Sequence, residues 1–207
     1  NFMRNFITKT LLLGIGIGVL QGMLIFAAVR FFTYSPKHTH YHANFAVFIN
    51  GERQQFKGFQ YYEDVAACSA YDEMTPKKRV HMHNNVNDSV HVHDEGVTWG
   101  AFFQNLGWAI GSDYIKTDEQ LYTDDDTNKL SFVLNGQDQP DVTNMVVGNK
   151  DRLLVSFGDE TDEELDKRFE QVAHTAHKHN QTQDPASCSG DEEVSVKDRF
   201  RHIFDTK

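Results

Sequence analysis

Residues 44–59, NFAVFINGERQQFKGF, contain the pattern that decides the fold of this chain. Alternate side chains of an extended strand leave the same face, so Phe45, Val47 and Ile49 share one apolar face. The dipeptide Asn-Gly at 50–51 follows, and Asn-Gly between two alternating runs is the strongest short-range signal for a β-hairpin. The stretch therefore predicts two antiparallel strands joined by a tight turn.

Turn signals and helix caps place the remaining elements of the domain. They predict short strands over 80–83 and 90–93, a helix over 99–106, and further strands over 130–134 and 152–157. A hairpin, a helix and two further strands is the element order of a β-grasp, ubiquitin-like domain. We therefore predict the α+β class: an N-terminal transmembrane helix, a β-grasp-like mixed sheet with one packed helix, and a helical C-terminal tail.

An apolar run near the N-terminus predicts a membrane anchor. Residues 11–29, LLLGIGIGVLQGMLIFAAV, form nineteen positions without a charge, a length that suits a helix crossing about 30 Å of hydrocarbon. A secretory signal is the rival interpretation, but Ala27-Ala28 is not followed by an A-x-A-like cleavage site, so an uncleaved anchor is favoured. A short tail followed by a long translocated domain places the C-terminal domain outside the cytoplasm.

The length and net charge of the chain limit how it can be divided into parts and what it can bind. The 207 residues carry a formal net charge of -10, which argues against a nucleic-acid partner and leaves the membrane, and a possible membrane-protein partner. A capping box, Thr161 with Glu164, opens an acidic amphipathic helix. The predicted parts are 1–30 (tail and anchor), 31–37 (spacer), 38–158 (histidine-rich domain) and 159–207 (acidic helix and tail).

The state expected for the two cysteines depends on the cellular compartment that holds the domain. Cys68 and Cys188 lie far apart and form no C-x-x-C motif. In an oxidising compartment they predict one disulfide that pins the C-terminal tail to the domain, whereas in a reducing cytosol they would be two free thiols.

Histidines gather in the first half of the chain. Seven of the eleven fall between 38 and 93, in three alternating runs: HTHYH at 38–42, HMH at 81–83 and HVH at 91–93. In a strand each run turns its imidazoles to one face. Because imidazole is the commonest protein ligand for transition metals, the three runs predict a metal site.

The second and third runs are predicted to face one another across a hairpin. A register that sets His81 opposite His93 also sets His83 opposite His91, and any register with the alternating valines and methionine in the core gives the same facing. Opposed Cβ atoms are about 4.5–5.5 Å apart, which brings four imidazoles within reach of one ion. With the first run on a neighbouring strand, the predicted ligands are His40, His42, His81, His83, His91 and His93. Six imidazoles exceed the needs of one ion, so either some support the ligands or two ions bind.

Nitrogen ligands alone do not identify the metal ion. Copper and zinc rank level and iron behind them, while Met82 alternates with the histidines into the core, which weakens a thioether site for Cu(I). His174, His177 and His179 are assigned to an exposed helix end. The alternative to a metal site is a solvated histidine-rich sheet face or a pH sensor that opens when its imidazoles charge.

Two blocks of the sequence carry a family resemblance. HYHANFAVFING and HVHDEGVTWGAFFQNLGW, within residues 38–110, resemble a family of small prokaryotic extracytoplasmic proteins with one membrane anchor. Some relatives are labelled protein-disulfide isomerase, but that name does not transfer because this chain lacks the C-x-x-C that thiol exchange uses.

Three functions fit these patterns. The leading prediction is a membrane-anchored, extracytoplasmic protein that acquires, buffers or delivers copper or zinc. The first alternative is a structural or interaction subunit of a membrane complex. The second is a histidine-ligated metalloenzyme, for which Asp94 and Glu95 beside His93 are the nearby carboxylates. Catalysis is the less favoured of these outcomes, and no catalytic residue is assigned.

Overall fold

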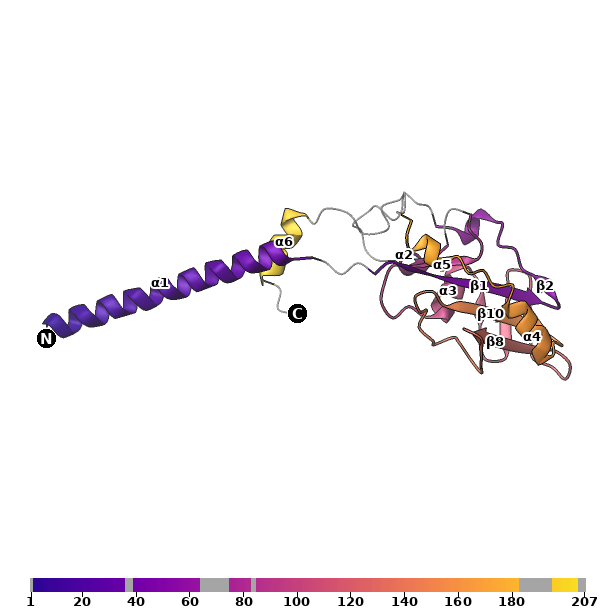
Figure 1. Ribbon diagram of the computed structural model, residues 1–207. Coiled ribbons are helices and arrows are strands. Elements are labelled where there is room, and N and C mark those ends of the chain that lie inside the picture. Colours follow the sequence, from indigo (N-terminus) through magenta and orange to yellow (C-terminus); the bar gives the residue numbers. More distant parts are fainter. Residues whose placement is uncertain (1, 36–38, 64–74, 83–84, 183–194, 205–207) are drawn as a thin grey trace. The chain divides into compact units, whose positions relative to one another are not determined.

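The chain divides into two units that are described separately. A computed structural model describes residues 2–35, 39–63, 75–82, 85–182 and 195–204 (Figure 1). Contacts between Cα atoms group Asn1–Lys37 with Glu192–Lys207, and make His38–Asp191 the second unit. Cys68 and Cys188 lie outside the described residues, so their disulfide stays a prediction, as do the predicted boundaries of the four parts.

The first unit contains an apolar helix and a short second helix. Helix α1 (Phe2–Thr33) confirms the predicted N-terminal apolar helix, and its segment Lys9–Thr33 is long and apolar enough to cross a membrane. Helix α6 (Val196–Phe204) packs against α1, with the rings of Phe31 and Phe200 at 5.1 Å.

A mixed sheet forms the centre of the second unit and confirms the α+β class. Its strands are β1 (Tyr41–Ile49), β2 (Glu52–Arg53), β3 (Val80–His81), β4 (Ser89–Val92), β8 (Lys129–Leu134), β9 (Gln137–Gln139) and β10 (Arg152–Gly158). The order is β3-β4-β1-β10-β8-β9, and β2 pairs with the end of β1. Strands β1 and β10 run parallel in the middle, while β4 and β8 flank them antiparallel.

The predicted Asn-Gly turn at 50–51 is present, and a second Asn-Gly turn lies at 135–136. Asn50 and Gly51 have φ of 49° and 84°, and Asn135 and Gly136 have 54° and 78°. Two successive positive φ values are what a type I′ hairpin turn requires. The predicted strand over 52–59 is wrong beyond Arg53, because the chain leaves the sheet and buries Phe56 in the core, 5.4 Å from the ring of Phe45.

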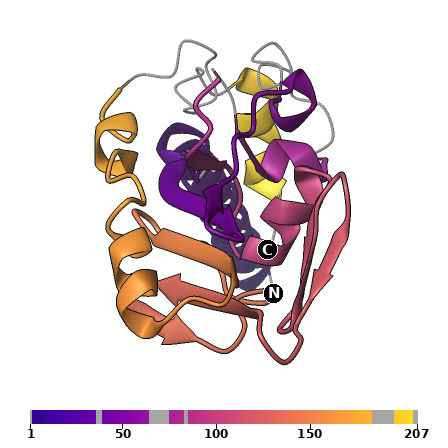
Figure 2. The same ribbon diagram turned by 90° about the vertical axis from the view of Figure 1, so that its right-hand side faces the viewer.

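Two helices cover opposite faces of the sheet (Figure 2). On one face, α3 (Trp99–Asn105) packs its aromatic side chains against Phe45, and its predicted N-cap is confirmed because the Thr98 hydroxyl accepts from the backbone N–H of Ala101. On the other face, α4 (Asp162–Phe169) packs against Ala46 and Phe48. The odd-numbered residues of β1 thus face α3, and His42 shares the even-numbered face with α4.

The acidic helix is shorter than predicted. The capping box of Thr161 and Glu164 is confirmed, but α4 ends at Phe169 and α5 (Ala176–His179) is a separate turn of helix. The guanidinium of Arg152 donates to the carbonyls of Phe169 at 3.0 Å and Val172 at 2.8 Å. Arg152 thus supplies hydrogen bonds to carbonyls at and beyond the end of α4, where helical partners are missing.

Several short elements were not predicted. They are η1 (Phe59–Tyr61), α2 (Pro76–Arg79) and a three-stranded sheet of β5 (Ala109–Ile110), β6 (Tyr114–Lys116) and β7 (Leu121–Thr123). Elements of two to four residues are too short to display a periodicity in sequence.

Candidate metal centre

Strand β4 brings histidines from three strands together. His91 pairs with His42 of β1 on one side and with His81 of β3 on the other. The predicted facing is confirmed, because Val80, Met82, Val90 and Val92 are all buried on the opposite face. The register that sets His81 opposite His93 is wrong: Val80 pairs with Val92, which sets His81 opposite His91. The predicted register also set His83 opposite His91, but His83 lies outside the described residues.

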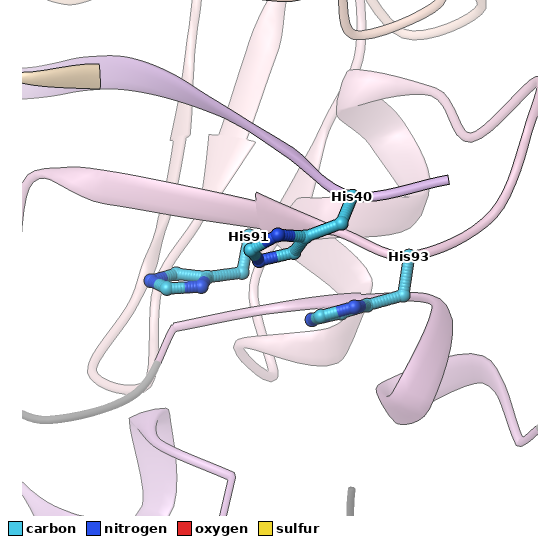
Figure 3. Close-up of side chains that lie close together, drawn as sticks. All are labelled: His40, His91 and His93. Carbon is cyan, nitrogen blue, oxygen red and sulfur yellow. The ribbon is translucent and has the colours of Figure 1, made fainter. Parts of the chain in front are cut away.

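Three imidazoles form a group that could hold a metal ion. One ligand nitrogen from each of His40, His91 and His93 lies within 4.8 Å of the others (Figure 3). Nitrogens bound at about 2.0–2.1 Å in a tetrahedral site lie about 3.3 Å apart. Metal binding at His40, His91 and His93 would therefore bring these nitrogens closer together than the 4.8 Å within which they lie.

His42 adds a fourth ring to this group, and its hydrogen bonds define its tautomer. The side-chain oxygen of Asn180 accepts from the backbone N–H of His42 at 2.9 Å and lies 2.7 Å from His42 Nδ1. Because that oxygen only accepts, Nδ1 carries the proton and Nε2 carries the lone pair of the neutral ring. His42 Nε2 lies 2.9 Å from His91 Nδ1, so the proton between the two rings belongs to His91.

A cation bound at His91 Nδ1 would replace this proton. Binding an ion at this nitrogen requires loss of its proton. Two lone pairs would then face one another across 2.9 Å, an arrangement that a cation between His42 and His91 relieves. His42 thus contacts His91, a member of the group that could hold a metal ion.

His81 lies at the edge of the same cluster. Its Nδ1 is 2.7 Å from the backbone carbonyl of Lys77 in α2, so Nδ1 donates and Nε2 carries the lone pair. A ring nitrogen bonded to a backbone carbonyl is the usual support of a metal-ligating histidine. The His81 ring is stacked 5.0 Å from that of His93 and 6.0 Å from that of His91.

Helix α5 contributes a histidine that sequence reasoning missed. The ring of His179, assigned to an exposed helix end, lies 5.5 Å from that of His42 and 6.5 Å from that of His91. The buried side chain of Asn44 places α5 there, because its oxygen accepts from the backbone N–H groups of Thr175 and Ala176. The signal that could have found this contact is the polar Asn44 within an otherwise apolar strand. His174 is exposed, as expected.

Asp94 and Tyr41 lie beside the histidines in sequence and bond to other groups. Asp94 accepts from Arg79 Nε at 2.6 Å and from the backbone N–H of Glu95. Burial raises the pKa of the Tyr41 phenol, and the carboxylates of Asp151 and Glu95 raise it further. The neutral phenol donates to the carbonyl of Val147 at 2.7 Å, which makes it a structural group rather than a phenolate ligand.

Replacing Asn180 with alanine is expected to lower metal affinity by about 10–100-fold, as for other residues that orient metal-ligating histidines. The change removes the acceptor that sets the tautomer of His42. Competition titration with a chromophoric chelator would measure the loss. Asn128→Ala is the matched control, because the Asn128 side chain bonds to Asp125 in a different loop. Equal affinities of the two variants would contradict a role for Asn180.

The grouping of imidazoles is the feature of the described residues that points to a function. Comparisons of the chain with protein-family models, with curated proteins and with solved structures found no match. The described residues provide a nitrogen-rich group, with His91 buried at its centre, that could hold a metal ion.

Proposed function

We propose that this chain is a membrane-tethered, extracytoplasmic protein that binds copper or zinc for acquisition, buffering or delivery. The observation that carries the proposal is the convergence of His40, His91 and His93 within 4.8 Å. The contact of 2.9 Å between His42 and His91 supports a fourth nitrogen ligand. A histidine-rich face that served only solubility would not require these rings to converge in a partly buried group.

The donor set supports copper or zinc as the ion. Imidazole nitrogens suit Cu(II), Zn, Ni and Fe, whereas Mg and Ca prefer oxygen. The Met82 thioether is fully buried on the other face of the sheet, which argues against a Cu(I) site that uses sulfur. Iron therefore ranks behind copper and zinc in this proposal.

The surroundings support binding ahead of catalysis. A metalloenzyme would need an acid or base beside the ion, and Asp94 and Glu95 are the candidates that the sequence offers. Asp94 is engaged with Arg79 at 2.6 Å, and Glu95 is exposed in the turn after β4. An interaction subunit remains the other alternative, and it predicts a stable partner whose binding survives replacement of the histidines.

Four finer features belong to the proposal. The domain is β-grasp-like, supported by parallel β1 and β10 between antiparallel β4 and β8, with α3 packed on one face of the sheet. Its membership of the single-anchor family rests on the two sequence blocks within 38–110. A disulfide between Cys68 and Cys188, and the placement outside the cytoplasm, are tested together by non-reducing mass spectrometry of protein from the intact membrane.

The test of metal binding uses the full chain, purified in detergent without a histidine tag. Elemental analysis and titration with Cu(II) and Zn(II) are expected to find at least one bound equivalent per chain. X-ray absorption should report a first shell of nitrogen without sulfur. Because neutral imidazole is the ligand and protons compete with the ion for its nitrogen, affinity should fall as the pH is lowered. Less than one equivalent of every divalent ion tested would overturn the proposal.

A further inference from the structure

Helix α6 carries an exposed apolar ridge. Val196, Phe200 and Phe204 follow one another at intervals of four residues, which places them on one side of the helix. Their exposed fractions are 63%, 55% and 81%. Large apolar side chains aligned in this way mark a surface that a partner covers.

Specific contacts hold α6 at the C-terminal end of α1. The guanidinium of Arg199 donates to the backbone carbonyls of Phe31 at 2.9 Å and Tyr34 at 3.2 Å. The last carbonyls of a helix lack partners within it, so Arg199 caps α1. The Phe31 and Phe200 rings meet at 5.1 Å, and the His202 ring stacks on Tyr34 at 4.4 Å.

These contacts make the ridge continuous with the apolar surface of α1. The side chains of α1 are exposed along the candidate span Lys9–Thr33, up to Val29 and Phe32 in its last turns. Phe200 touches Phe31 at this end, so an apolar environment that surrounds α1 reaches the ridge without a break. Lys197 and the exposed Arg201 follow Val196 and Phe200 directly in sequence and border the ridge on one side, where they suit anionic phosphate groups.

We infer that α6 is an interfacial helix that inserts its ridge of Val196, Phe200 and Phe204 into the lipid surface where α1 leaves the bilayer. The inference rests on the membrane span of the proposed function, but not on metal binding. A lipid surface is the occupant that covers α1 and the ridge together. The helix would hold the C-terminal end of the chain at the membrane beside the anchor.

Lipid quenching of single tryptophan substitutions tests this inference. The full chain would be placed in bilayers whose lipids carry bromine near the headgroup end of the acyl chain, a depth of about 5–10 Å for an interfacial helix. Phe204→Trp reports the ridge, Asp198→Trp the side about 160° around the helix from Val196 and Phe200, and Phe26→Trp the anchor. Trp99 and Trp108 are buried in the other unit and supply a background that the wild-type chain measures.

The expected result is several-fold stronger quenching for Phe204→Trp than for Asp198→Trp, with Phe26→Trp quenched by bromine at greater depth. Quenching of Phe26→Trp with none at Phe204→Trp would overturn the inference and leave the anchor intact. Blue-shifted but unquenched emission from Phe204→Trp would mean that protein covers the ridge, which also overturns it. No quenching of Phe26→Trp would remove the membrane span on which the inference depends.

Discussion

Replacing His91 with glutamine is expected to reduce the affinity for Cu(II) or Zn(II) by at least about 100-fold, more than the loss of an outer supporting residue. His91 is the shared member of the cluster: it belongs to the group with His40 and His93, and its Nδ1 lies 2.9 Å from His42. Its removal would take away a proposed ligand and also the ring nitrogen that contacts His42 Nε2. Isothermal titration with a competing chelator would measure the change.

The same variant must remain folded for that loss to have meaning. Glutamine keeps a polar side chain at a position that is 5% exposed, so the midpoint of thermal unfolding of the metal-free chain should change little. His174→Gln is the matched control, because His174 is exposed and contacts the ring of His177, outside the group of His40, His91 and His93. If His91→Gln bound metal as tightly as His174→Gln, the cluster would not be the binding site.

Features set by neighbours in sequence could be predicted. The turns at Asn50 and Asn135, the cap at Thr98 and the capping box at Thr161 each depend on residues within a few positions. The alternation of histidine with valine or methionine likewise determined which side of each strand faces the core, because strand parity is independent of register.

Features set by distant segments could not be predicted. The register of β3 depends on Val80 meeting Val92, and a shift of two residues would have kept the same faces buried. The position of His179 depends on Asn44, which lies 131 residues before its partner Thr175. Sequence spacing does not indicate such a contact, so the approach of α5 and His179 to the cluster could be seen only in the structure.

Replacing Asn44 with alanine is expected to cost about 2–4 kcal/mol of the free energy of unfolding, because several buried hydrogen-bonding groups lose their partner. Asn44 is 1% exposed, and its oxygen accepts from the N–H groups of Thr175 and Ala176 at 2.9 Å and 2.8 Å. Its nitrogen donates to the carbonyl of Asp88 at 2.9 Å and to the Thr175 hydroxyl at 3.0 Å. Denaturant unfolding followed by tryptophan fluorescence would measure the loss.

The variant should also separate the positioning of α5 from the stability of the sheet. Hydrogen exchange at the amides of Thr175 and Ala176 is expected to accelerate, and metal affinity to fall, because Asn180 is released with α5 from His42. Asn87→Ala is the matched control, since the Asn87 side chain donates to the exposed Gln55 at 3.2 Å and not to α5. Unchanged protection of both amides in Asn44→Ala would mean that α5 is held over the histidines by other contacts, and the coupling between this strand residue and the cluster would be lost.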